Sequence, residues 1–433
     1  MSLRDRLFAD GLYTFAFRLI TMGIAAVLGI LTARMLGPAG RGIYAIPLVT
    51  LSLVSAGYAG LNNATAHFML RYRVGRAVLV PAFISALLFV LAGIPATYLI
   101  ARSLGAPWAA IPAALALPGP AMLAIFYGYQ IGTDRVRMNT SYAALNTTLL
   151  LGLMLAALTI FGALPRSAIL AWVVSSDLAA LAAGLWLVVD ARRLDAGTLE
   201  TRRFAWYALR VGSVSLISLL NYRADVYVVA AFGGPTMLGM YTLAVTAAEM
   251  LLAATQVSAV VSSPQIGSLE SSRAAAELTA RCVRNNILVA AVACATLALV
   301  APFAVRVLYG VAFMPMIPAF RVLLVGVFAL SLGSPISSYF TIRLGKPQIP
   351  MMLAAVSAII CVGVSTLAIR HLGLVGAALG STIGYLVAAG ACIAVFARDA
   401  AVPVARVLVP RWSDVSAYAA AGSALYRQLR GAV

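Results

Sequence analysis

Two stretches of the chain, "LGPAGRGIY" at residues 36–44 and "FGGPTMLGMY" at residues 232–241, contain the same phrase. Each reads Gly-Pro-x-x-x-Gly-x-Tyr, and each lies between two long apolar runs. Glycine readily ends a helix and proline cannot continue one. The aromatic ring that follows is typical of a membrane interface. The repeated phrase therefore predicts a tight turn between two membrane helices, used twice.

The composition excludes a water-soluble globular fold. Hydrophobic residues make up 63% of the chain and charged residues 10%, whereas soluble domains carry roughly 25% charged residues. Lipid must therefore be the solvent for most of the surface. The four cysteines fall singly, mostly within apolar runs, and predict packing and not a disulfide framework or a metal site.

Twelve apolar runs are long enough to span a bilayer as helices, which requires about 20 residues each. In hydrocarbon only helices and closed barrels satisfy every backbone polar group, and the long continuous runs favour helices. The first run is expected to be retained and not cleaved as a signal peptide. The predicted spans are approximately 12–35, 42–69, 78–101, 107–131, 139–162, 167–189, 207–231, 236–262, 285–308, 317–342, 349–369 and 374–397.

The positive charges test this count independently. The net charge is +18, and of the 31 Lys and Arg residues, 22 fall in one alternating set of loops and seven in the other. Arg18 and Arg223 are the two that remain inside spans. This asymmetry predicts that both termini are cytoplasmic. It also accounts for the basic charge without a nucleic-acid partner.

The two copies of the phrase lie between spans 1 and 2 and between spans 7 and 8, which puts both on the extracytoplasmic side. A weaker echo joins spans 5 and 6 ("FGALPRSA", 161–168) and spans 11 and 12 ("LGLVGAAL", 372–379). Any tight helical hairpin could use Gly-Pro, but matched positions favour two six-helix bundles related by a pseudo-two-fold axis along the membrane normal. The predicted parts are an N-terminal lobe (1–190), a cytoplasmic connector (191–206), a C-terminal lobe (207–398) and a tail (399–433) with an interfacial amphipathic helix.

Several phrases resemble the polysaccharide flippases of the multidrug, oligosaccharidyl-lipid and polysaccharide exporter superfamily. They are "ARMLGPAGRGIYA" (33–45), "NYRADVYVVAAFGGPTMLGMYTLA" (221–244), "LYG" and "PAFRVL" (308–323), "LGKP" (344–347) and "GLVGAALGSTIGY" (373–385). The resemblance covers essentially all twelve spans. It implies a multi-pass protein of the bacterial inner membrane, with two bundles around a central cavity, that moves a polyprenyl-diphosphate-linked oligosaccharide to the outer face.

Charged residues at mid-membrane cost roughly 2.5–3.5 kcal/mol on insertion scales, so each needs a reason. Arg18 and Arg223 are the candidates for gripping a diphosphate, because a guanidinium can donate to phosphate from two directions. Arg18 could instead snorkel to the interface. Asn221, Arg223 and Asp225 lie close together in span 7, but Arg223 and Asp225 point to nearly opposite sides. An ion pair with another helix is the alternative role for them.

Three acids are candidates for coupling transport to a proton or sodium ion: Asp225, Glu249 and Asp177. Each could instead be a hydrogen-bonded packing residue. In span 2, Asn63 and His67 lie on one helical face and are candidates for lining the substrate path. His67 could equally be a packed core residue. We expect no bound cofactor and no metal, since neither histidine has neighbours at metal-ligand spacing.

A flippase is the leading function, because a saccharide cannot cross hydrocarbon unaided. A cation-coupled multidrug exporter of the same architecture is the alternative, although arginines in spans 1 and 7 argue against it. The outside loops are too short to carry a catalytic domain, so we predict that the chain is not an enzyme. Buried charges argue against a mere scaffold. The expected partners are a lipid-linked oligosaccharide, membrane lipids and other polysaccharide assembly proteins.

Overall fold

The computed structural model describes residues 3–194, 197–269 and 271–411. Within these ranges all regular elements are helices, and the chain divides into two compact units. Unit 1 comprises Met1–Thr242 and Arg306–Phe313, and unit 2 comprises Leu243–Val305 and Met314–Val433. The lobe boundaries predicted at 1–190 and 207–398 stay a prediction.

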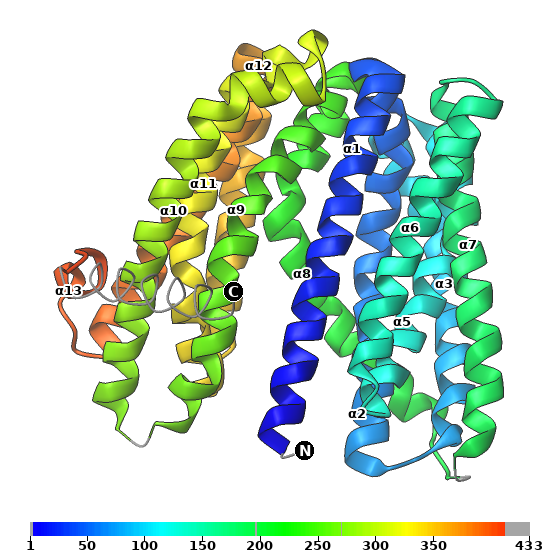
Figure 1. Ribbon diagram of the computed structural model, residues 1–433, viewed down its shortest axis with the longest axis horizontal. Coiled ribbons are helices and arrows are strands. Elements are labelled where there is room, and N and C mark those ends of the chain that lie inside the picture. Colours follow the sequence, from blue (N-terminus) through cyan, green and yellow to red (C-terminus); the bar gives the residue numbers. More distant parts are fainter. Residues whose placement is uncertain (1–2, 195–196, 270, 412–433) are drawn as a thin grey trace, which may run out of the picture. The chain divides into compact units, whose positions relative to one another are not determined.

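Unit 1 contains the first eight α-helices and the start of the ninth (Figure 1). A short 3-10 turn, η1 (Ala56–Tyr58), separates the first two in sequence. The helices are α1 (Leu3–Ser55), α2 (Ala59–Tyr72), α3 (Leu79–Ser103), α4 (Ala110–Leu115), α5 (Pro118–Gly132), α6 (Val136–Ile160), α7 (Pro165–Asp190), α8 (Thr201–Phe232) and α9 (Gly234–Ser268).

Unit 2 contains the rest of α9, α10 up to Val305, and three further helices. A 3-10 segment, η5 (Val311–Met316), precedes α11, and a π-helical segment, η6 (Tyr339–Arg343), follows it. The helices are α10 (Ser272–Leu308), α11 (Ile317–Ser338), α12 (Gln348–Asp399) and α13 (Val404–Leu408). The amphipathic tail helix predicted after residue 411 lies outside the described residues.

The described chain has ten stretches that are long and apolar enough to cross a membrane. Two of them, Tyr13–Tyr72 and Gln348–Asp399, contain a sharp backbone break, at Gly37 and at Gly373. Each of these two therefore supplies two spans, and the predicted all-α fold with twelve spans is confirmed. The boundaries differ in places: α8 begins at Thr201, six residues before the predicted span, and Pro118 divides the fourth span into α4 and α5.

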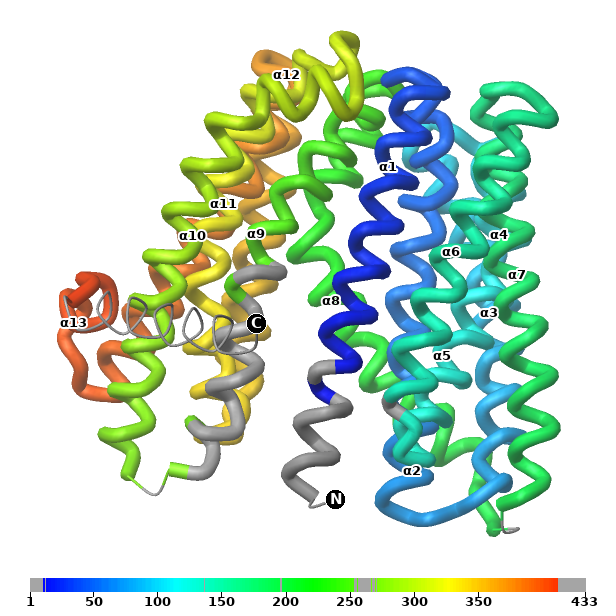
Figure 2. The backbone as a smooth tube through the Cα atoms, in the orientation of Figure 1, coloured from blue at the N-terminus to red at the C-terminus, as the bar shows by residue number. Residues whose placement is uncertain are grey.

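The repeated phrase makes the same backbone turn in both copies. Gly37 has φ 65° and Gly234 has φ 71°, a left-handed conformation that costs glycine little and other residues more. In each copy a proline follows the glycine directly, within the first turn after the break, where its missing N–H is not needed. Figure 2 shows α1 doubling back at this turn. The predicted helix–turn–helix is present in both places.

The two copies also pack against each other within unit 1. A side chain added at Gly42 would overlap the carbonyl oxygen of Pro235, and one added at Gly239 would overlap the carbonyl oxygen of Pro38. These are the same two positions of the phrase, taken in opposite order. A contact in which residue i meets j and j meets i is typical of a two-fold relation. The phrase is therefore repeated because each copy is the other's packing surface.

Glycines also let the helices of unit 1 approach closely. The helix α2 packs against α5 and α8, α1 packs against α6, and α7 packs against α5 and α6. At Gly60 a side chain would overlap the carbonyl oxygen of Ala208 on α8, and at Gly128 it would overlap that of Asn62 on α2. Because lipid gives no hydrophobic drive between membrane helices, close backbone contact of this kind supplies much of the packing.

Unit 2 has a separate core built around α11 and α12. The fully buried rings of Phe340 and Phe396 lie in it together with Ile336 and Tyr339. The side-chain amide of Asn286 on α10 donates to the carbonyl oxygen of Ser331 on α11 at 3.0 Å. A polar side chain satisfied across two helices in this way fixes their register.

We expect Gly42→Ala to destabilise the protein, since the added methyl group would overlap backbone of the other copy. Overpacking of this kind typically costs about 1–3 kcal/mol. Thermal unfolding of the detergent-solubilised protein measures the effect as a lower Tm. Gly152→Ala on α6 is the matched control, because nothing lies within 4 Å of its added methyl group. Equal Tm values for the two variants would contradict a contact between the copies.

Candidate functional site

The buried carboxylate of Asp225 is held by the second copy of the repeated phrase. The Tyr241 hydroxyl donates to Oδ2 of Asp225 at 2.6 Å, and the backbone N–H of Val226 donates to its Oδ1 at 2.8 Å. Asp225 is 2% exposed and Tyr241 is fully buried. The acid thus joins α8 to the beginning of α9 within unit 1. Holding these two helices together is the structural role of Asp225. Its suggested role in ion coupling stays a prediction.

Arg223 lies well inside α8. It precedes the end of the helix at Phe232 by nine residues, or about 14 Å, which is about half the thickness of a hydrocarbon core of about 30 Å. The side chain is half-buried and interacts electrostatically with Tyr227 one turn further on. The Tyr227 hydroxyl forms a 2.9 Å hydrogen bond with Ser52 on α1. A polar connection between α8 and α1 therefore accompanies this arginine.

The other predicted polar residues of unit 1 are spread over four helices. Asn221 is buried on α8, two residues before Arg223. Arg18 on α1 is exposed, 19 residues before the break at Gly37, or about 28 Å along the helix. That distance is close to the thickness of a hydrocarbon core, about 30 Å. The structure thus brings Asn221, Arg223 and Asp225 together on α8, with Arg18 at a different depth on α1.

The α2 residues Asn63 and His67 differ in their surroundings. Asn63 is exposed, and its amide donates to the carbonyl oxygen of Ala59 in its own helix at 2.8 Å. The half-buried ring of His67 stacks on Tyr207 of α8, with centroids 4.5 Å apart and planes 9° apart. This contact belongs to an aromatic cluster that also includes Phe68 and Tyr72. The stacking agrees with the alternative in which His67 is a packed core residue. A place for His67 on the substrate path stays a prediction.

The two remaining candidate acids lie on α7 and α9. Asp177 on α7 is half-buried, and its Oδ1 is a buried atom with no hydrogen-bond partner in the described part of the chain. Glu249 on α9 is half-buried and belongs to unit 2. A half-buried carboxyl group is what we expect of an acid that exchanges an ion inside a membrane protein. The coupling role of Asp177 and Glu249 stays a prediction.

One buried acid was missed in the sequence. Asp190, at the end of α7, accepts hydrogen bonds at Oδ2 from Arg135 Nη1 at 2.7 Å and from the Tyr129 hydroxyl at 2.9 Å. Arg135 also lies over the ring of Trp186, 5.5 Å from its centroid. The position of Asp190 between an apolar run and the basic connector gave no signal, because its partners are 55 and 61 residues away in the chain.

A basic pocket of about 890 Å³ lies in unit 2. Five arginines line it against two acids, Glu277 and Asp399, which leaves a net charge of +3. Arg284 is 7% exposed and donates to the carbonyl oxygen of Arg406 at 2.8 Å. An anionic group is the ligand that such a pocket attracts. The arginines are Arg273, Arg281, Arg284, Arg406 and Arg411.

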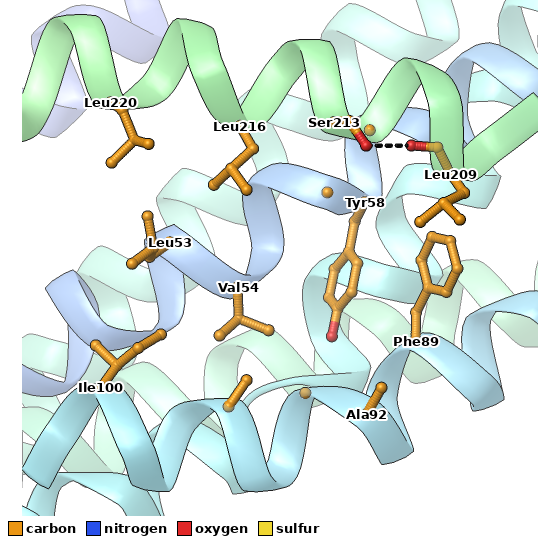
Figure 3. Close-up of a pocket in the computed structure, with 14 residues that line it drawn as sticks. Leu53, Val54, Tyr58, Phe89, Ala92, Ile100, Leu209, Ser213, Leu216 and Leu220 are labelled. Carbon is orange, nitrogen blue, oxygen red and sulfur yellow. Dashed lines mark hydrogen bonds between the residues drawn. The ribbon is translucent and has the colours of Figure 1, made fainter. Parts of the chain in front are cut away.

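Unit 1 has an apolar groove between α3 and α8, with a volume of about 490 Å³ (Figure 3). We call it the α3–α8 groove. The Tyr58 ring forms part of its wall, and the only side-chain hydrogen bond drawn there returns from Ser213 to the Leu209 carbonyl of its own helix, at 2.8 Å. The walls are therefore almost entirely hydrocarbon. They include Leu53, Tyr58, Phe89, Ile100, Leu209 and Leu220.

Comparisons with known proteins agree with the resemblance seen in the sequence. A family model described as "Polysaccharide biosynthesis protein" matches residues 7–270, more than half of the chain. No curated protein sequence matches the chain.

Solved structures of MATE transporters share the fold. A MATE protein in the straight conformation has a TM-score of 0.62 at 19% identity, over 90% of this chain and 96% of that one. An outward-facing multidrug resistance MATE family transporter of the MOP superfamily has a TM-score of 0.56 at 19% identity, over 90% and 93%. A variant of the Vibrio cholerae MATE transporter VcmN has a TM-score of 0.59 at 14% identity, over 91% and 96%. At these identities the likeness concerns the fold.

We expect Tyr241→Phe to destabilise unit 1, because it removes a donor from a buried carboxylate. Leaving such a group unsatisfied costs about 1–3 kcal/mol, and more when it is charged. A lower Tm in detergent measures the loss, and adding Asp225→Asn to Tyr241→Phe should recover part of it. Tyr44→Phe, at the same position in the first copy of the phrase, is the matched control. Equal losses at Tyr44 and Tyr241 would mean that the loss does not come from the hydrogen bond to Asp225.

Proposed function

Because the chain belongs to the polysaccharide biosynthesis protein family, we propose that it is a secondary transporter that moves a polyprenyl-diphosphate-linked oligosaccharide from the cytoplasmic to the outer leaflet of the bacterial inner membrane. It is a multi-pass membrane protein with the fold of MOP-superfamily transporters, and we place both termini in the cytoplasm. Each unpaired sugar hydroxyl costs kilocalories in hydrocarbon. The protein spares the headgroup this cost by enclosing it in a polar chamber while the prenyl tail stays in lipid, and by alternating access.

The observation that carries this proposal is the basic pocket of unit 2. A diphosphate is a dense anion, and arginine binds phosphate through parallel N–H donors. Five arginines against two acids suit such a headgroup. A pump for cationic drugs needs the opposite charge in its pockets. The location of these arginines, between α10, α12 and the segment around α13, puts them on the side that we assign to the cytoplasm, where the substrate enters.

In unit 1 we assign the diphosphate to Arg223, with Arg18 as the arginine nearer the membrane edge. We assign sugar and headgroup contacts to Asn63, His67 and Asn221. Amide and imidazole groups exchange hydrogen bonds with hydroxyls, which suits a saccharide. These assignments are proposals, and substituting each residue tests its proposed contact.

We assign ion coupling to Asp225, Glu249 and Asp177. Two donors within unit 1 bind Asp225, so it would take part only by releasing them. Protonation of Asp225 would disturb the joint between α8 and α9. A proton or sodium ion is the proposed coupling ion, and other polysaccharide assembly proteins are the proposed partners.

We expect Arg223→Ala to abolish surface polysaccharide in a strain that depends on this chain, while its amount in the membrane stays normal. Arg223→Lys should retain part of the activity, because lysine keeps the charge but loses the fork of donors. Arg210→Gln is the matched control, since Arg210 is an exposed arginine on the same helix. Extraction and quantification of the polysaccharide, with an immunoblot of the protein, gives the answer.

Normal polysaccharide in the Arg223→Ala strain would remove Arg223 from the mechanism. A drug-sensitivity panel on a strain lacking the chain tests the whole proposal. Hypersensitivity to cationic drugs together with normal polysaccharide would replace the flippase by a multidrug exporter.

A further inference from the structure

Two pockets of unit 1 adjoin each other. The α3–α8 groove shares Phe89 and Leu209 with a second pocket of about 580 Å³, which is lined also by Glu200, Arg202, Arg203 and Trp206. One end of the combined cleft is therefore hydrocarbon and the other is basic. Figure 3 shows Phe89 and Leu209 side by side at the end of the groove. An amphiphile is the kind of molecule whose two ends match these two surroundings.

The cleft runs along the helices for the length of a lipid chain. Phe89 and Ile100 on α3 are 11 residues apart, and so are Leu209 and Leu220 on α8. At a rise of 1.5 Å per residue, each pair spans about 16 Å. Arg203 precedes Leu209 by six residues, or about 9 Å. The exposed Trp206 lies between them, and tryptophan favours the membrane–water interface.

The arginines at the basic end are placed to receive a phosphate. The guanidinium of Arg203 lies over the Tyr72 ring, 4.5 Å from its centroid, and over the Phe68 ring at 5.7 Å. A cation held over aromatic rings keeps its charge, and the side chain of Arg203 is exposed to a ligand. Arg202 is exposed beside it. Together with Glu200 these residues give the pocket a net charge of +1.

We propose that this cleft binds one anionic phospholipid of the cytoplasmic leaflet. The phosphate lies at Arg202 and Arg203, and one acyl chain lies in the α3–α8 groove. The groove runs about 16 Å along the helices, which suits most of one acyl chain.

Size and charge separate this lipid from the proposed substrate. A polyprenyl carrier is several times longer than one acyl chain, so most of it would lie outside the groove. A phosphodiester carries one negative charge, which matches the net charge of +1, whereas a diphosphate carries more. Basic residues next to membrane helices on the cytoplasmic side are typical sites for anionic headgroups. The cleft is thus a site for a lipid of the bilayer, distinct from transport.

The test uses the full chain, purified and stripped of lipid in detergent. Phosphatidylglycerol or phosphatidylcholine is then titrated while Tm is followed, and native mass spectrometry counts the bound lipids. Binding to the folded state raises Tm in proportion to occupancy. We expect phosphatidylglycerol to raise Tm and to give one retained adduct, and phosphatidylcholine to do much less.

Two double variants address the two ends of the cleft. Ala92→Phe with Ala96→Phe fills the groove, and should abolish the retained adduct. Arg202→Gln with Arg203→Gln removes the charge, and should raise the phosphatidylglycerol concentration at half-effect by roughly tenfold or more.

Each double variant has a matched control elsewhere in the chain. Ala291→Phe with Ala295→Phe alters two exposed alanines at the same spacing on α10, and Arg192→Gln with Arg193→Gln alters two adjacent exposed arginines. Both controls should behave as the unaltered protein. The proposal is overturned if either test variant binds phosphatidylglycerol like its control, or if phosphatidylcholine binds equally well. Stronger competition by a polyprenyl phosphate would also overturn it and assign the cleft to the tail of the transported lipid.

Discussion

The fold of this chain depends on one constraint, which is that the membrane-spanning backbone has no water to hydrogen-bond with. In hydrocarbon each N–H and C=O must find a partner within the protein, which confines the membrane-spanning parts to helices and makes every reversal of direction costly. The repeated phrase meets this demand twice, with a left-handed glycine followed by proline. Further glycines then bring helices into backbone contact, at Gly60 in α2 and at Gly42 beside the other copy. Glycine at these positions lets two backbones touch, and this contact supplies packing that lipid does not drive.

The buried acids of unit 1 act at joints between helices. Asp225 ties the end of α8 to the start of α9 through Tyr241, and Asp190 ties the end of α7 to the loop before α6 through Arg135. Neither acid is left exposed to lipid, where the cost of its charge would be uncompensated. Asp177 and Glu249 are the other two acids proposed for ion coupling.

Arginine serves three purposes in the same molecule. Arg34 donates to the last carbonyl oxygens of α10, at Val307 and Leu308, which stabilises a helix end. The arginines of the unit 2 pocket give unit 2 an anion-attracting cavity, and Arg202 and Arg203 give a lipid-facing cleft its basic end. A single side-chain chemistry, a charge that persists at every physiological pH and donates through a planar fork, underlies all three. It suits a protein whose proposed substrate and whose solvent both carry phosphate.

The sequence by itself determined the class of fold, the number of spans and the two matched turns. These depend on local properties: about 20 apolar residues for each crossing, and glycine with proline wherever the chain must reverse. The family resemblance was visible for the same reason, since its phrases are turns. Only the tertiary structure decided that Tyr241 holds Asp225, that His67 stacks on Tyr207 and that Ser52 meets Tyr227 across 175 residues of chain. The contact between the two copies of the repeated phrase and the α3–α8 groove beside Tyr58 were likewise decided only by the tertiary structure. Such features depend on which helices become neighbours and how they are rotated, and a periodic apolar pattern is the same for many arrangements of neighbours.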